Sequence, residues 1–155
     1  MIYYDKPYKI LLVSDFITGK ESFLDEILAD QAQKTSNSAY FKSVTIVLKD
    51  LNKSEEIQEA DGFMVLFSIE NRASFENVQN WVCTVRCINQ SAPILLVAEK
   101  KDLRDRAQTK GELNLVSKDE IKTKCDELKL KFIETSSVKQ DGSVKQALFK
   151  LISMI

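Results

Sequence analysis

The sequence predicts an α/β fold: a three-layer sandwich in which helices cover both faces of a mostly parallel sheet of five to six strands. Two observations lead to this prediction. Short apolar, β-branched runs alternate with longer segments of helical period along the whole chain. The apolar runs are mostly continuous, as is typical of strands that are buried on both faces. No linker, repeat or low-complexity tract divides the 155 residues, so a single domain covering residues 1–155 is expected.

The individual elements follow from composition and period. Five segments are predicted strands: Tyr8–Val13, Val44–Leu48, Gly62–Phe67, Ile94–Ala98 and Lys131–Glu134. Four segments are predicted helices: Lys20–Gln31, Ser74–Ile88, Ser117–Leu128 and Ser143–Ile155. Ser117 and Glu120 have the spacing of a capping box at the start of the third helix. A turn at Asn37-Ser38 is expected ahead of an antiparallel edge strand, and Arg104–Val116 is expected to be a surface loop.

The composition excludes several classes of function. A net charge of −1 gives no electrostatic basis for binding nucleic acid. The chain has no histidine, which excludes mechanisms that need an imidazole base or a histidine metal ligand. No segment approaches the roughly 18 apolar residues of a membrane span. The last five residues hold no cysteine for lipid attachment, so no membrane anchor is visible in this chain.

Three cysteines without a signal peptide predict a reducing, cytoplasmic location. Cys83 and Cys87 have the i, i+4 spacing of one helix face, and Cys125 is distant in sequence. Two thiols and one distant third do not supply the ligand set of a zinc site. The three thiols are therefore expected to be buried or half-buried structural groups.

The carboxyl ends of the predicted strands carry polar residues, which makes this edge of the sheet the expected ligand site. Ser14–Glu21, directly after the first strand, is similar to a phosphate-binding loop, whose pattern is glycine, four residues, then Gly-Lys-Ser/Thr. Gly19 and Lys20 match this pattern. Ser14 replaces the first glycine, and Glu21 replaces the hydroxyl that would bind magnesium. The loop is therefore interpreted as built on a nucleotide-binding plan whose chemistry has been altered.

Three blocks of sequence carry a resemblance to a known family: Ala60–Trp81, Pro93–Leu103 and Phe132–Ser137. With the phosphate-loop remnant, they resemble the small GTPases of the Ras superfamily, nearest the Ras and Rab branches. The resemblance covers nearly the full length and implies the G-domain fold of that superfamily. The intervals from Lys20 to Asp50 and from Asp50 to Ala60 are shorter than is usual in the family, which implies shortened switch regions.

On the phosphate side, the resemblance implies that Lys20 would contact the phosphates of a nucleotide. Glu21 brings negative charge where the family has a neutral magnesium ligand, and Asp50 retains the carboxylate on the magnesium side. Lys53 replaces the glycine that approaches the γ-phosphate, and Ser54 stands where a glutamine would orient the attacking water. No catalytic residue is predicted, and no metal site except Asp50 if nucleotide binding is retained.

On the base side, the Asn-Lys-x-Asp pattern of the family appears as Glu99-Lys100-Lys101-Asp102. Asp102 could still accept from the N–H groups of guanine, whereas an ionised Glu99 cannot donate as the amide would. Ser136 matches the last loop of the family, in which Ser137 and Val138 replace alanine and lysine. The remaining candidates for contact with a guanine nucleotide are Gly19, Lys20, Lys100, Asp102 and Ser136.

Two hypotheses follow from the resemblance. The first is a pseudo-GTPase, a protein-interaction module that needs no cofactor, does not hydrolyse GTP and binds nucleotide weakly or not at all. The alternative is a divergent switch that binds GTP or GDP through Lys20, Asp50 and Asp102 with unusual magnesium handling. A receiver domain of a two-component system is a third reading, but the second acidic residue expected beside Asp15 is absent. In the first case the partner is a protein that the sequence does not identify.

Overall fold

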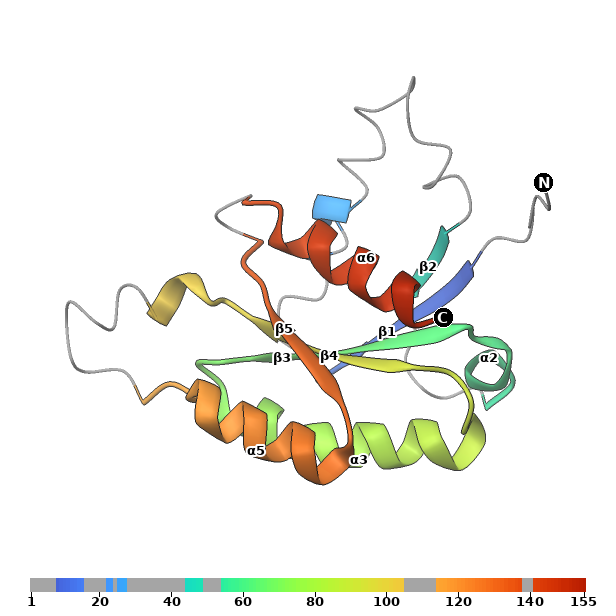
Figure 1. Ribbon diagram of the computed structural model, residues 1–155, viewed down its shortest axis with the longest axis horizontal. Coiled ribbons are helices and arrows are strands. Elements are labelled where there is room, and N and C mark those ends of the chain that lie inside the picture. Colours follow the sequence, from blue (N-terminus) through green and yellow to red (C-terminus); the bar gives the residue numbers. More distant parts are fainter. Residues whose placement is uncertain are drawn as a thin grey trace, which may run out of the picture.

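The fold is organised around a five-stranded parallel sheet (Figure 1). The computed structural model describes residues 8–15, 22–23, 25–27, 44–48, 54–104, 114–137 and 141–155. The strands have the order β2-β1-β3-β4-β5. Their bounds are β1 Tyr8–Ser14, β2 Val44–Leu48, β3 Gly62–Ser68, β4 Ile94–Glu99 and β5 Lys131–Glu134. All four strand pairs are parallel, which confirms the predicted α/β class.

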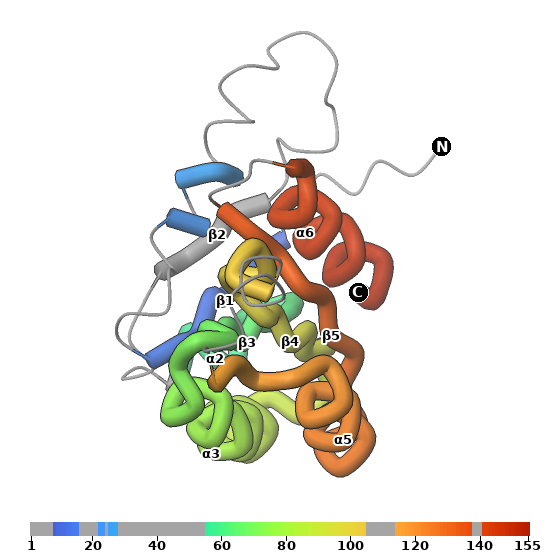
Figure 2. The backbone as a smooth tube through the Cα atoms, turned by 90° about the vertical axis from the view of Figure 1, so that its left-hand side faces the viewer, coloured from blue at the N-terminus to red at the C-terminus, as the bar shows by residue number. Residues whose placement is uncertain are grey.

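Helices lie on both faces of this sheet, so the fold has three layers. Helices α3 (Arg72–Ile88) and α5 (Lys118–Leu128) lie on one face, and α6 (Ser143–Met154) lies on the other (Figure 2). Residues 22–23 and 25–27 are helical, and Phe23 and Ile27 pack with α6. A short helix, α2 (Ser54–Glu59), precedes β3.

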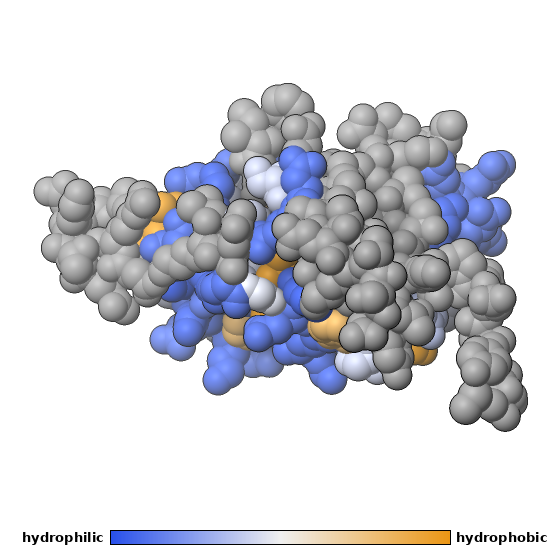
Figure 3. All heavy atoms as spheres, turned by 90° about the horizontal axis from the view of Figure 1, so that it is seen from above, coloured by the Kyte–Doolittle hydropathy of each residue, from blue (hydrophilic) through white to orange (hydrophobic). Residues whose placement is uncertain are grey.

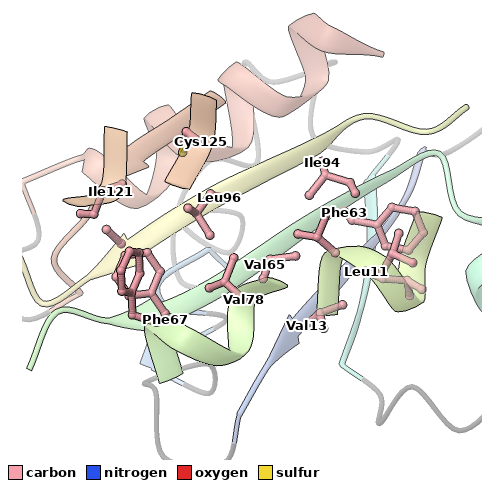
Figure 4. Packing of buried hydrophobic residues seen from close by; sticks show 14 of the residues in the cluster. Leu11, Val13, Phe63, Val65, Phe67, Val78, Ile94, Leu96, Ile121 and Cys125 are labelled. Atoms are coloured by element: carbon pink, nitrogen blue, oxygen red, sulfur yellow. The ribbon is translucent and has the colours of Figure 1, made fainter. Parts of the chain in front are cut away.

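The core consists of two apolar clusters that the sheet separates. Figure 4 shows the first cluster, in which Val65 and Leu96 of the central strands pack with Val78 of α3 and Ile121 of α5. The second cluster places the alternate strand residues Met64 and Leu95 against Leu148 and Leu151 of α6. All seven residues of β3 are buried, as the continuous apolar run predicts for a strand covered on both faces. The central strands therefore form a fully buried support for groups at their carboxyl ends.

Three of the predicted helices begin and end close to where the structure has them, whereas the ends of the fourth, Lys20–Gln31, lie outside the described residues. Ser117 and Glu120 form the capping box at the start of α5, as predicted. Helix α3 begins at Arg72, two residues before the predicted start, because the Asn71 side chain accepts from the Ser74 N–H. Gly142 precedes α6 with φ of 83°, a backbone conformation that glycine adopts without strain.

Three expectations need correction or lie outside the described residues. Helix α2 was not predicted, and Val116, expected in a surface loop, is fully buried with its N–H bonded to the Ile69 carbonyl. Cys83 and Cys87 are exposed rather than buried, whereas Cys125 is buried as expected. The expected turn at Asn37-Ser38 and the edge strand after it lie outside the described residues.

Most of the coloured atoms on the face shown in Figure 3 are hydrophilic.

Asn89, directly after α3, joins two elements at the amino-terminal edge of the sheet. Its side-chain amide donates to the carbonyls of Ile57 and Ala60, at 2.9 and 3.0 Å. Its side-chain oxygen accepts from the Ala92 N–H at 3.1 Å. This buried side chain therefore holds the end of α2 and the turn before β4 in place through polar groups that water does not reach.

Candidate functional site

The candidate site lies at the carboxyl edge of the sheet, where several strands end in polar residues. Ser68 and Glu99 are partners in the register of β3 and β4, and both side chains are buried. Thr135 directly follows β5 and is fully buried. Parallel strands bring these ends together at one edge, which is where ligands bind in open α/β sheets. The site can therefore be built from these strand ends outward.

Glu99 is the central group of this edge, and its carboxylate bonds within the protein. Oε1 of Glu99 accepts from the hydroxyls of Thr135 and Ser137, at 2.6 and 3.1 Å. The backbone N–H groups of Lys100 and Ser137 also donate to this carboxylate. Only 2% of the residue is exposed. Glu99 thus ties the end of β4 to the loop after β5.

Asp102 and Ser136 form a second buried pair between the same two segments. The Ser136 hydroxyl donates to Oδ1 of Asp102 at 2.8 Å, and both residues are buried. The Ser136 backbone N–H donates to the Ser143 hydroxyl at 3.0 Å. The structure therefore brings two of the predicted site residues together, and it fixes them against the start of α6.

Lys100 and Lys101 are engaged in ion pairs at the same edge. Lys100 has φ of 68°, and its ammonium group pairs with the Glu70 carboxylate. The Lys101 ammonium lies 2.8 Å from Oδ2 of Asp141. The hydrogen bond from Lys101, with a further bond from Ser143, lowers the pKa of Asp141 below its ordinary value. Lys100 therefore lies at the predicted edge, with its charge paired to an acid after β3.

Asp15, at the end of β1, bonds to α3. Its carboxylate accepts from the Asn77 side-chain amide at 2.8 and 3.0 Å and from the Trp81 indole N–H at 2.8 Å. These residues are more than 60 positions apart in sequence. Residue spacing contains no signal for this cluster, and the sequence did not predict it. The contact attaches the beginning of the phosphate-loop remnant to α3.

Other predicted site residues lie outside the described part of the chain: Gly19, Lys20, Glu21, Asp50 and Lys53. Ser54 is the first residue of α2. Among the described residues, no group of three or more cysteine, aspartate and glutamate side chains could hold a metal ion. The roles of Gly19, Lys20, Lys100, Asp102 and Ser136 toward a nucleotide stay predictions.

The base side fits a guanine nucleotide only in part. The buried Asp102 carboxylate, which accepts one bond from Ser136, is a suitable acceptor for N–H groups. The acceptor edge of guanine needs a donor instead, and Glu99 supplies a carboxylate already saturated by protein donors. A guanine acceptor that faces this filled carboxylate finds no donor and stays unpaired, at a cost of about 1–3 kcal/mol. Glu99 therefore does not supply the hydrogen-bond donor that a guanine base would need at this position.

The parallel sheet, with helices on both faces and polar loops at its carboxyl edge, has the architecture that the small-GTPase class requires. A model of the Ras family matches residues 48–155, well over half of the chain. The chain therefore belongs to the Ras family.

Several Ras-related proteins are similar to almost the whole chain. They include RabY of Dictyostelium discoideum, with 24% identity over 175 aligned positions covering 98% of this chain and 71% of that protein. Rab-3 of Caenorhabditis elegans is 27% identical over 173 positions, covering 98% of this chain and 75% of that protein. Human Rab-3A has the same identity and coverage. All three alignments are longer than the 155-residue chain, so these relatives contain residues that the chain lacks.

Burial raises the pKa of the Glu99 carboxyl above its ordinary value of 4.5, and its hydrogen bonds act in the opposite direction. Between pH 4.5 and the raised pKa, the folded protein binds a proton that the unfolded chain releases. The free energy of unfolding therefore falls as the pH rises through this window. The pKa values of Glu120 and Asp141 are lowered, so the titration of these groups changes the free energy of unfolding only below about pH 4.5.

We expect Glu99→Gln to remove this pH dependence. Melting temperatures measured from pH 4.5 to about pH 7.5 should show the wild type losing a few degrees relative to the variant as the pH rises. The matched control is Glu127→Gln, which changes an exposed carboxylate on α5 and should leave the profile unchanged. Parallel profiles for the wild type and Glu99→Gln would contradict the assignment of this titration to Glu99.

Proposed function

We propose that this chain is a pseudo-GTPase: a protein-interaction module with the Ras-family fold that does not hydrolyse GTP and binds guanine nucleotide weakly or not at all. The main support is the buried Glu99 carboxylate, whose acceptor positions are filled by Thr135, Ser137 and backbone N–H groups. These contacts tie the end of β4 to the loop after β5 and leave Glu99 no free position toward a base.

The phosphate side of the site supports the same proposal. By the resemblance, Glu21 would bring a negative charge to the position of a neutral magnesium ligand, and Ser54 lacks the carboxamide that would orient a water molecule. Asp15 holds the start of the loop to α3 through the side chains of Asn77 and Trp81. The start of this loop is therefore attached to α3 by side chains of the protein.

The partner in this proposal is a protein, and the location is the reducing cytoplasm. All three cysteines are free thiols, which is compatible with that compartment. A net charge of −1 argues against a nucleic-acid partner. None of the described helices is both long and apolar enough to span a membrane. By analogy with the family, residues 31–58 are the proposed partner-binding region.

The alternative is a GTP- or GDP-binding switch with unusual magnesium handling. One observation favours it: the Asp102 carboxylate and the Ser136 hydroxyl form the pair that the resemblance implies for reading guanine. In this case Lys20 and Asp50 would contact the phosphates and the metal. The two functions differ in whether the purified protein carries a guanine nucleotide.

Nucleotide content of the freshly purified protein tests the proposal. After denaturation, chromatography should find much less than one equivalent of GDP or GTP. Adding either nucleotide, with magnesium or with a chelator, should leave the melting temperature unchanged, because a ligand stabilises only the state that binds it. About one equivalent of bound guanine nucleotide, or stabilisation by several degrees, would overturn the pseudo-GTPase and establish the switch.

A further inference from the structure

The two exposed cysteines of α3 are not used by the proposed function. Cys83 and Cys87 are both exposed, and the residues of α3 that face the core are Ser74, Phe75, Val78, Val82 and Val85. Residues four apart in a helix are neighbours on one face, with Cβ atoms about 5–6 Å apart. The two thiols therefore lie side by side on the solvent side of α3.

The helix holds this pair in a fixed register. Cys87 is in the last turn of α3, where a free helix end would fray. Here the Asn89 N–H closes the turn on the Val85 carbonyl at 2.8 Å, and the Asn89 side chain is anchored in the core. Arg86 donates to the Leu128 carbonyl at 2.6 Å, which attaches the same turn to the end of α5. The spacing of the two thiols is therefore set before any ligand arrives.

This spacing excludes a direct bond between the two sulfurs but allows a bridging atom. A disulfide needs Cβ atoms about 3.5–4.5 Å apart, which is less than the helical spacing of about 5–6 Å. One ion with two sulfur ligands at about 2.3 Å holds the sulfurs roughly 4–4.6 Å apart, the larger value when the ion is two-coordinate and near-linear, and side-chain rotation can reach this separation. An unstrained helix can therefore chelate through Cys83 and Cys87.

The number of donors selects the ligand. Zinc takes four ligands, and the described residues place no third cysteine or carboxylate in a common group with this pair. Cys125 cannot join it, because this thiol is buried between α5 and the sheet, and burial raises its pKa to about 11. Soft thiolates favour Cu(I), an ion that two sulfur ligands can satisfy.

We infer that Cys83 and Cys87 form a two-thiolate site for a soft, low-coordinate thiophilic ion, of which Cu(I) is the biological representative. Binding converts two thiols and one Cu(I) into a bis-thiolate complex and releases two protons, without any change of oxidation state. The site is on the outer face of α3 and does not involve the carboxyl edge of the sheet. The inference therefore does not depend on the proposed function.

Phenylarsine oxide, whose arsenic forms two As–S bonds with release of one water molecule, is the first probe. One equivalent added to the reduced protein should protect both exposed thiols from a chromogenic disulfide reagent. The variant Ala73→Cys/Cys83→Ser is the matched control, because it keeps two exposed thiols on α3 but separates them by about 21 Å. Losing the second, intramolecular bond should weaken its binding by about 100-fold or more.

A second variant tests whether spacing is the cause. Gln79→Cys/Cys87→Ser rebuilds the i, i+4 pair one turn earlier on the same face and should bind like the wild type. Wild-type binding no tighter than that of the separated-thiol control would overturn the site. Full binding by Cys83→Ser/Cys87→Ser, which leaves only Cys125, would also overturn it.

Cu(I) itself is tested by competition with a chromogenic Cu(I) chelator under anaerobic, reducing conditions. The wild type should retain one Cu(I) per chain at a chelator concentration that strips the Ala73→Cys/Cys83→Ser control. Zinc added in place of copper should be held weakly, because two of its four positions have no protein ligand. Arsenical binding without retention of Cu(I) would overturn copper as the ligand of this site.

Discussion

Replacing Glu21 with serine and Glu99 with asparagine should raise the affinity of this chain for GDP by roughly 30-fold or more. The change Glu99→Asn would replace a saturated carboxylate with an amide donor, which recovers about 1–3 kcal/mol at the base. The change Glu21→Ser would remove a negative charge from the loop that the resemblance assigns to the phosphates, worth on the order of 1 kcal/mol. Isothermal titration with GDP and magnesium would measure the change.

A matched control variant completes this test. Glu55→Ser/Glu127→Asn makes the same change of charge at two exposed positions and should leave GDP affinity unchanged. A similar gain in this control would mean that net charge, not the site, limits binding. No gain in Glu21→Ser/Glu99→Asn would contradict the view that these two residues prevent nucleotide binding.

Replacing Asn89 with alanine should lower the free energy of unfolding by about 3 kcal/mol. The change would remove the Asn89 partner of the Ala60 carbonyl and of the Ala92 N–H, and it would leave the Ile57 carbonyl with only the 3.4 Å bond from the Ala60 N–H. Unpaired buried groups cost about 1–3 kcal/mol each before the surrounding structure relaxes. The corresponding loss in melting temperature is about 6–12 °C for a domain of this size.

Urea denaturation would measure this loss, with Asn80→Ala as the control. Asn80 is also in α3, but it is exposed, and its amide donates to the exposed side-chain oxygen of Asn77. Its replacement should change the free energy of unfolding by no more than about 0.5 kcal/mol. Equal losses in the two variants would show that Asn89 does not brace α2 and β4.

The sequence predicts the strands because a strand that is buried on both faces is a continuous apolar run. The run Gly62–Phe67 is continuously apolar, and the structure extends the strand by one residue to the buried Ser68. Helix α2 has no comparable apolar pattern, since it is six residues long and only Ile57 contributes to the core. Its position depends on Asn89, which is 32 residues from Ile57, and a local pattern does not contain that contact.

The candidate site was predictable to a similar extent. Strand order brings Glu99 and Asp102 to one edge with Ser136, and the sequence predicts this edge. It does not reveal that the Glu99 carboxylate bonds Thr135 and Ser137, because hydrogen-bond partners depend on side-chain geometry. A buried glutamate beside two hydroxyl residues can be identified only once the strands have been placed.

The bond between Trp81 and Asp15 gives the protein an optical reporter. Trp81 is the single tryptophan of the chain, and its indole N–H lies 2.8 Å from Oδ1 of Asp15. Indole emission responds to the electric field of a neighbouring carboxylate, so the fluorescence of the unlabelled protein follows the end of β1. Ligand binding, partner binding and folding at this edge can be observed without attaching a dye.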